Sequence, residues 1–288
     1  KPKSRRFETG NPMPLVSILM AAFQAEATIT AAVNSVMRQK HPHWELIIAS
    51  DCGADYIDLC RASGIQDKRI RMVKSPTIGA GPSVARNAAF DQARGDFLAI
   101  LDSDDTWKAD KLSALLPLAM KSGLACDNTC AVNPDGSVIA TAYPIDNTQR
   151  DIDALAMINS GVPHFPLLRR EIAGNGFQAE LRFAEDVVFN MEAISRAGAM
   201  TLLPRPLTNY IQRPNSATNN ATAWRRAEAA YGQILAMLEA GELAVPSGVN
   251  AAIWTAFKDK RRLNLAYGAA VESGTATTFQ DFLSQQRK

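Results

Sequence analysis

Residues 14–51 read PLVSILMAAFQAEATITAAVNSVMRQKHPHWELIIASD, which is two apolar runs with a helical stretch between them. Both runs are nearly continuous rather than alternating, which is typical of strands covered on both faces of a sheet. The stretch between them has one apolar stripe at helical spacing, formed by Ile29, Val33, Val36 and Met37. A strand, a helix of crossover length and a second such strand predict a βαβ unit with parallel strands.

The same alternation continues to residue 101. Two more apolar runs, RIRMVKS at 69–75 and DFLAIL at 96–101, follow the helical patterns ADYIDLCRASG (54–64) and PSVARNAAFDQARG (82–95). The chain has 288 residues, of which 47% are hydrophobic, and this is enough to bury a substantial core. We therefore expect an α/β fold with a mostly parallel, Rossmann-like sheet flanked by helices.

Polar residues follow the expected strands at their carboxyl ends, where sheets of this kind bind ligands. Asp51 follows the second strand, Arg86 lies in the helix after the third, and Asp102 and Asp104 follow the fourth. We expect these side chains to converge on one rim of the sheet. The loop GAGPS at 79–83 lacks the pattern of a phosphate-binding loop.

The stretch FLAILDSDDTW, residues 97–107, runs from an apolar strand into Asp102, Asp104 and Asp105. Three carboxylates at such a strand end repel one another, and a bound divalent cation offsets this electrostatic repulsion. Because Mn²⁺ and Mg²⁺ prefer oxygen ligands, we expect one of them at Asp102 and Asp104, with Asp105 in support. The stretch also fits the Asp-x-Asp-x-Thr motif of haloacid-dehalogenase-type phosphatases, but that family carries the motif on its first strand. Here three strands precede it.

Three stretches, taken in order, resemble family 2 glycosyltransferases of the GT-A fold: residues 14–51, GPSVARNAAFDQARGDFLAILDSDDTWKADKL at 81–112, and AEDVVFN at 184–190. The resemblance runs from about residue 14 to 215. It implies a metal-dependent enzyme that moves a sugar from a nucleoside-diphosphate sugar, taken to be a UDP-sugar, to a saccharide or lipid-linked saccharide. It also implies inversion at the anomeric carbon. After residue 215, beyond the resemblance, the sequence pattern itself predicts a helical C-terminal extension.

The resemblance also assigns roles to single residues. Asp102 and Asp104 hold the metal, Asp186 is the catalytic base, and its neighbour Glu185 is the substitute for that role. Burial at the start of a helix would raise the pKa of Asp186 toward the range that a base needs. The donor-binding residues that the resemblance implies are Ala21, Phe23, Asp51, Arg86, Asp102, Ser103 and Arg213.

Within the donor-binding set, the resemblance implies that Asp51 faces the nucleobase and that Arg86 lies near the diphosphate. It also implies that Arg213 contacts the diphosphate or belongs to a lid. This sequence departs from the family after the first strand, where AAFQ at 21–24 replaces the usual turn, and at Ser50, where the family commonly has Asp. The preferred nucleobase therefore stays open.

Two other functional classes stay open. A nucleotidyltransferase shares the fold class, but the Gly-rich, Arg-containing loop that it carries after the first strand is missing from AAFQAEATI at 21–29. A non-catalytic subunit that binds a sugar nucleotide is disfavoured by the intact Asp102, Asp104 and Asp186. His164, in GVPHFP, is expected to be structural or on the surface rather than part of an acceptor cleft.

The expected organisation is an N-terminal tail at 1–13, a GT-A domain at 14–214 with halves at 14–108 and 109–214, and a helical region at 215–288. The elements expected after residue 108 are a helix at 108–123, a hairpin around NPDG within 124–144, a loop at 144–166, a helix at 183–198, strands at 199–204 and 207–213, and helices at 224–241 and 250–274.

The composition limits the kinds of partner and the compartment that we expect for this protein. A net charge of +2 gives no reason to expect a nucleic acid. The absence of a long apolar run and of a signal-peptide pattern suggests a cytoplasmic protein, and the four cysteines are expected to be free thiols. Three alternatives stay open for the C-terminal helices: packing on the core, forming a homodimer, or contacting the inner face of a membrane. The basic cluster KDKRR at 258–262 is the reason for the third.

Overall fold

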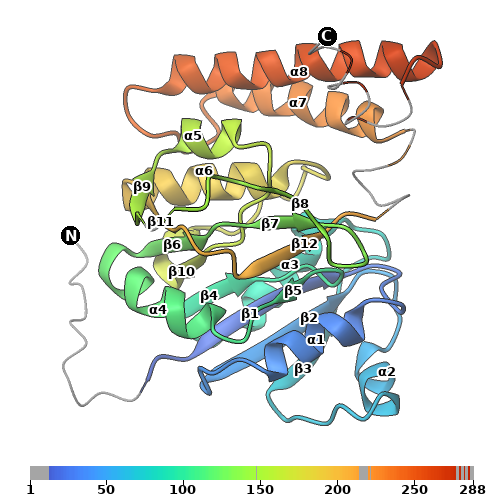
Figure 1. Cartoon of the computed structure of the whole chain (residues 1–288), viewed down its shortest axis with the longest axis vertical. Coiled ribbons are helices and arrows are strands. Elements are labelled where there is room, and N and C mark those ends of the chain that lie inside the picture. Colours follow the sequence, from blue (N-terminus) through green and yellow to red (C-terminus); the bar gives the residue numbers. More distant parts are fainter. Residues whose placement is uncertain are drawn as a thin grey trace.

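A computed structural model describes residues 13–146, 148–213, 220, 222–276, 279, 282 and 285. In these residues an eight-stranded sheet has the order β3-β2-β1-β4-β10-β6-β11-β9 (Figure 1). Its strands are β1 (Val16–Ala22), β2 (Trp44–Ser50), β3 (Ile70–Lys74), β4 (Phe97–Ile100), β6 (Leu124–Asp127), β9 (Arg150–Ile152), β10 (Leu167–Arg169) and β11 (Met200–Leu203). A smaller sheet has the order β5-β12-β7-β8, with β5 (Thr106–Trp107), β7 (Cys130–Val132), β8 (Val138–Thr141) and β12 (Thr208–Ile211).

The helices cover both faces of the large sheet. They are α1 (Ile29–Met37), α2 (Tyr56–Ala62), α3 (Pro82–Gln92), α4 (Lys111–Ser122), α5 (Ala154–Asn159), the 3-10 helix η1 (Arg170–Ala173), α6 (Glu185–Ala197), α7 (Ala223–Ala240) and α8 (Asn250–Glu272). One buried cluster joins α1, α2 and α4 to one face of the sheet, and a second joins α3, α5 and α6 to the other.

The predicted βαβ units are confirmed. Strand β1 pairs in parallel with β2 and with β4, and β2 pairs in parallel with β3. Of the predicted stripe on α1, Ile29, Val33 and Val36 are buried and Met37 is partly buried. The carboxyl ends of these strands therefore lie along one rim, as the sequence predicted.

Strand β10 joins the two predicted halves of the GT-A domain into one sheet. It lies antiparallel between β4 and β6, with Leu168 opposite Leu98 on one side and Leu124 on the other. The sequence did not predict this strand, which has only three residues. The boundary at 108/109 stays a prediction, and nearly all of the tail at 1–13 lies outside the described residues.

The segment 144–166 was predicted as a loop, and this was wrong in part. It contains β9, which pairs with β11, and α5, whose N-terminus is capped by Asp153 through a 2.8 Å hydrogen bond from the amide of Ala156. Met157 and Ile158 of α5 are buried in the core. Elements this short are stabilised mainly by tertiary contacts, which leave a weak local signal.

The predicted hairpin at 124–144 is half right. Strands β7 and β8 pair antiparallel around the turn NPDG, as predicted. Residues 124–127, however, form β6 in the large sheet, where they pair with β10 and β11. The chain between β6 and β7 thus passes from one sheet to the other.

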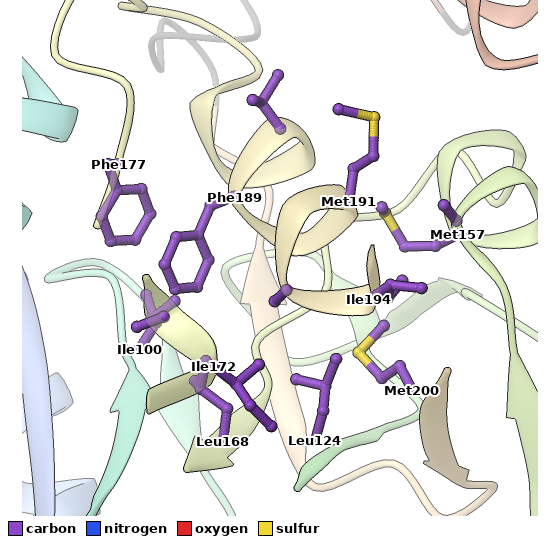
Figure 2. Packing of buried hydrophobic residues seen from close by; sticks show 14 of the residues in the cluster. Ile100, Leu124, Met157, Leu168, Ile172, Phe177, Phe189, Met191, Ile194 and Met200 are labelled. Atoms are coloured by element: carbon purple, nitrogen blue, oxygen red, sulfur yellow. The ribbon is translucent and has the colours of Figure 1, made fainter. Parts of the chain in front are cut away.

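The C-terminal helices pack on the same core as the sheet. Figure 2 shows α6 above the strands, with Phe177 stacked on Phe189 at a ring distance of 4.2 Å. The same cluster continues into α7 through Ile234 and into α8 through Phe257, both fully buried (Figure 1). Packing on the core is thus confirmed among the three alternatives, while a dimer and a membrane contact stay predictions. No helix in the described part of the chain could cross a membrane.

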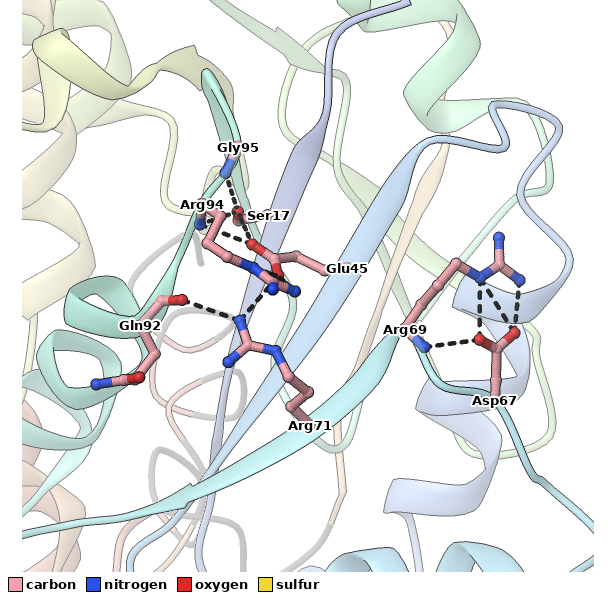
Figure 3. A network of polar contacts seen from close by, with 8 residues as sticks. All are labelled: Ser17, Glu45, Asp67, Arg69, Arg71, Gln92, Arg94 and Gly95. Atoms are coloured by element: carbon pink, nitrogen blue, oxygen red, sulfur yellow. Dashed lines mark hydrogen bonds and ion pairs between the residues drawn. The ribbon is translucent and has the colours of Figure 1, made fainter.

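A buried polar network ties the amino ends of the strands together (Figure 3). The carboxylate of Glu45 in β2 accepts hydrogen bonds from Ser17 Oγ at 2.7 Å, from Arg71 Nη2 at 2.8 Å and from the backbone amide of Arg94 at 2.7 Å. Burial alone would raise the pKa of Glu45, but these hydrogen bonds lower it to about 2. The network therefore joins β1, β2, β3 and the turn before β4.

Candidate active site

The three carboxylates after β4 lie together. One oxygen each from Asp102, Asp104 and Asp105 lies within 4.8 Å of the others. Burial, and then repulsion by Asp102, raises the pKa of Asp104, and the same two causes raise that of Asp105 further. The cluster is therefore a set of closely spaced hard oxygen donors, which are the ligands that a divalent cation such as Mg²⁺ or Mn²⁺ prefers.

Strand β12 closes against this cluster. The amide of Ile211 donates to Asp105 Oδ1 at 2.8 Å, and Arg213, just after the strand, forms an ion pair with Asp104. Asp105 is buried, whereas Asp102 and Asp104 are half-buried. The two outer carboxylates are thus the accessible ones, and Arg213 lies beside Asp104. Its predicted contact with a diphosphate or a lid stays a prediction.

Arg86 of α3 connects the carboxylate cluster to α6. It is buried, and it donates to Asp102 Oδ1 at 2.6 Å and to Glu185 Oε1 at 2.8 Å. Burial alone would lower the pKa of Arg86, but the two carboxylates raise it above its ordinary value. One guanidinium thus holds the end of β4 and the start of α6 next to each other.

Helix α3 also fixes the segment that leads into α6. Asn87 exchanges two hydrogen bonds with the backbone of Phe177, both at 2.8 Å, and Ser83 Oγ donates to the carbonyl of Leu181 at 2.7 Å. A side chain at Gly176 would place its Cβ 2.5 Å from Asn87 Oδ1, and the φ of Gly176 is +86°. The glycine therefore allows the close approach that brings α6 to the rim.

Asp186, in the first turn of α6, is half-buried near the carboxylates of Glu185 and Asp102. Burial, followed by repulsion from Glu185, raises its pKa to about 7, although Arg86 acts in the opposite direction. The residue before the helix, Ala184, has a left-handed backbone with a φ of 57°, which is strained for a residue with a side chain. A carboxylate with a pKa near neutral pH has the properties of a general base.

The other proposed donor residues lie on the same rim. Asp51 is buried, and its two carboxylate oxygens accept from the amides of Ala80 at 3.0 Å and Gly81 at 2.9 Å, so it holds the loop 79–81. Its contact with a nucleobase stays a prediction. Ser103 is buried, Ala21 is half-buried and Phe23 is exposed.

His164 is buried, and burial lowers its pKa to about 4, so the ring is neutral at pH 7. Its ring lies 5.6 Å from that of Tyr143. Burial in the protein interior agrees with the structural role expected for this residue.

Three residues of the site were missed. Asn87 belongs to the quoted stretch 81–112, but in the helical part of that stretch only Arg86 was given a role. Tyr231 of α7 and Lys260 of α8 interact electrostatically with Asp186. They lie in a region with no recognisable motif, so only the packing of the helices could have revealed them.

Comparison with known proteins agrees with this geometry. The sequence profile of glycosyl transferase family 2 matches residues 17–177, which is more than half of the chain. The chain is 41% identical over 116 residues to the putative teichuronic acid biosynthesis glycosyltransferase TuaG of Bacillus subtilis, covering 40% of this chain and 46% of TuaG. It is 36% identical over 207 residues to the succinoglycan biosynthesis protein ExoO of Rhizobium meliloti, covering 67% of this chain and 59% of ExoO.

Among solved structures, residues 1–349 of S. aureus TarS share the fold, with a TM-score of 0.63 and 18% identity over 84% of this chain and 70% of that one. The same TarS fragment in complex with UDP-GlcNAc gives a TM-score of 0.62 at 21% identity, over 77% of this chain and 66% of that one. These similarities establish a GT-A fold. The chain spans about half the length of the curated relatives that it matches first. On the profile match and the fold together, the chain belongs to glycosyl transferase family 2.

Proposed function

We propose that the protein is a metal-dependent, inverting glycosyltransferase that moves a sugar from a UDP-sugar to a saccharide or lipid-linked saccharide. The observation that carries this proposal is the cluster of Asp102, Asp104 and Asp105, which Arg86 joins to Glu185, the neighbour of Asp186. The cluster and a candidate base thus meet at one rim. Two charges develop when a sugar leaves a diphosphate: a negative charge on the diphosphate and a positive charge on the sugar. The carboxylate cluster with its metal and the candidate base lie where they can act on both.

On the donor side, Asp102 and Asp104 would hold Mn²⁺ or Mg²⁺, because they are the accessible oxygen donors of the cluster. When bound, such an ion stabilises the negative charge of the leaving diphosphate. Arg86 and Arg213 lie next to these carboxylates and add positive charge on the same side. The TarS structure in complex with UDP-GlcNAc supports a UDP-sugar as the donor.

On the acceptor side, Asp186 would remove the proton of the attacking hydroxyl. Its pKa of about 7 leaves part of the protein molecules with an ionised Asp186 at neutral pH, and this carboxylate can then accept a proton. Glu185 was the substitute candidate, but its carboxylate is bound to Arg86. We therefore assign the base to Asp186 and a positioning role to Glu185.

Relatives support the acceptor class. Two of them are named UDP-Glc:alpha-D-GlcNAc-diphosphoundecaprenol beta-1,3-glucosyltransferases, WfgD and WfaP of Escherichia coli. A lipid-linked saccharide therefore heads the acceptors to be tried on this protein.

The test uses UDP-sugars with and without Mn²⁺, measuring UDP release and, by thermal shift, donor binding. We expect Asp186→Asn to bind donor normally but to lower transfer by about 10²–10⁴-fold. Asp104→Ala should weaken metal-dependent donor binding itself. Asp91→Asn, an exposed carboxylate on α3, is the matched control and should change neither measurement.

The outcomes separate the alternatives. If the native protein bound no sugar nucleotide, with or without metal, that result would contradict the proposal. Donor binding without turnover would instead favour the non-catalytic subunit. If Asp186→Asn lost donor binding while Asp104→Ala kept it, the two roles would have to be exchanged.

A further inference from the structure

The C-terminal helices reach the proposed base through a chain of ring contacts. Phe183, just before α6, makes an edge-to-face contact with Tyr231 of α7 at a ring distance of 6.2 Å. Tyr231 in turn lies 6.3 Å from the ring of Phe257 on α8. Lys260 follows Phe257 by one helical turn, so the two side chains share a face of α8. These contacts bring this part of α8 to the start of α6, and the carboxylate of Asp186 acts to raise the pKa of Lys260.

This placement is held by several contacts. Arg261 Nε of α8 donates to Glu228 Oε1 of α7 at 2.6 Å, and Asn264 Nδ2 donates to the carbonyl of Trp224 at 2.8 Å. After α7, the amide of Ala244 donates to Glu192 Oε1 of α6 at 3.1 Å. Both C-terminal helices also enter the buried core around α6. Lys260 is therefore positioned by the fold and not by a loose tail.

Lys260 is half-buried, yet in the described part of the chain it has neither a hydrogen bond nor an ion pair. Burial lowers its pKa, and the carboxylate of Asp186 acts against that shift without a direct ion pair. The ammonium nitrogen of Lys260 is not among the buried polar atoms without a partner, so it still reaches solvent and is open to a ligand. The other cations of the site differ in this respect, because Arg86 is bound to Asp102 and Glu185.

Charge also favours an anion on this side of the site. Asp186 is surrounded by the negative charges of Glu185 and Asp102, which would repel an anionic acceptor. Lys260 supplies positive charge where such an acceptor would approach the base. A neutral acceptor could accept a hydrogen bond from this ammonium group but would gain no pairing of charges.

We propose that Lys260 binds an anionic group of the acceptor, a phosphate or a carboxylate, while the hydroxyl of the same acceptor lies at Asp186. The inference rests on the proposed function and adds to it the chemical class of the acceptor. It makes α8 part of the acceptor site.

The test compares acceptors in matched pairs, using the UDP-sugar identified by the UDP-release screen. One pair is an N-acetylglucosaminyl diphosphate with a short alkyl chain and the corresponding neutral alkyl glycoside. The other is an alkyl glucuronide and the corresponding alkyl glucoside. Transfer is measured with the native protein and with Lys260→Met, Lys260→Arg and Lys258→Met. Lys258 is exposed on the same helix and lies over Trp254, so it is the matched control.

We expect the native protein to prefer one charged acceptor over its neutral partner. Lys260→Met should raise KM for that acceptor by about 10- to 100-fold, the loss of one charge-assisted hydrogen bond. KM for the neutral partner, donor binding and Tm should stay unchanged. Lys260→Arg should keep most of the preference, and Lys258→Met all of it. The pair that shows the effect identifies the anion as phosphate or carboxylate.

Three results would overturn the inference: no preference for either charged acceptor, an equal loss for both members of a pair in Lys260→Met, or no transfer to any of the four by a protein that binds donor. Failure of the native protein to bind a UDP-sugar is a different result, because it removes the proposed function itself.

Discussion

Arg86 contacts two carboxylates that lie far apart in the sequence, Asp102 and Glu185. Each of the three side chains would be costly to bury alone. Arg86 balances only one of the two negative charges, so the three side chains keep a net charge of −1, and the guanidinium is bound to these two carboxylates rather than to Asp186, the residue after Glu185. The pKa of Asp186 is raised first by its own burial and then by the negative charge of Glu185, while Arg86 acts in the opposite direction.

The first prediction concerns the pH dependence of transfer. Because Asp186 must be ionised to act as a base, kcat/KM should rise with pH through about 7. Glu185→Gln removes a negative charge that disfavours ionisation of Asp186, so its pKa should fall and the profile should move to lower pH. Glu180→Gln, an exposed change before α6, is the control. An unmoved profile in Glu185→Gln would contradict this electrostatic account.

At this scale the sequence predicted the residues that lie in contiguous motifs. Asp102, Asp104 and Asp186 could be found because each belongs to a stretch whose pattern is local. Lys260 could not be found, because its position near Asp186 depends on how α6, α7 and α8 pack against one another. No local pattern of α8 separates Lys260 from the exposed Lys258.

At the scale of elements, Gly176 controls how closely the segment before α6 approaches α3. Gly176→Ala would combine an unfavourable φ of +86° with a Cβ only 2.5 Å from Asn87 Oδ1. Gly198→Ala is the matched control, because its φ is +93° and no atom lies within 4 Å of the added Cβ. We expect Gly198→Ala to lower the free energy of unfolding by about 1 kcal/mol.

Gly176→Ala should lower the free energy of unfolding by more than its control does. It should also lower transfer, because Asn87 or Phe177 must move and α6 carries the proposed base. Urea unfolding and UDP release measure the two effects. Equal stability losses in the two variants, with transfer unchanged in both, would show that the close approach to Asn87 has no consequence for the site.

The Glu45 network gives a prediction about acid stability. The pKa of Glu45 falls from its ordinary 4.5 to about 2 in the folded state, so its contribution is complete above pH 4.5 and is lost as the pH falls toward 2. The shift corresponds to about 3 kcal/mol. Glu45→Gln should therefore flatten the decline of Tm between pH 6 and pH 3, while Glu171→Gln, an exposed control, should follow the native curve.

The long apolar strands β1 to β4 were predictable because buried parallel strands are nearly continuous apolar runs. The short elements β9, β10 and α5 were not, because three to six residues carry little periodicity. Their identity depends on partners that come from elsewhere in the chain. The strand β10 is the clearest case, since LLR alone fits a strand, a helix or a loop.

For the whole molecule, the shared core predicts one cooperative unfolding unit. Phe257 on α8 is fully buried in the cluster that also contains the strands and α6. Phe257→Ala should lower the free energy of unfolding by about 3–5 kcal/mol in a single transition. Far-UV circular dichroism and donor binding should lose signal at the same urea concentration. Two separate transitions would mean that α7 and α8 unfold independently and form a domain of their own.

Strand β4 has a further consequence for how the protein is made. It pairs with β1 on one side, and among the described residues β10 is the strand that pairs with its other side; the residues of β10 are synthesised long after 97–100. Until residues 167–169 leave the ribosome, the backbone of an apolar strand stays open to pairing with another chain. Aggregation during synthesis thus competes with the arrival of a three-residue strand, and any truncation before residue 167 leaves that edge permanently uncovered.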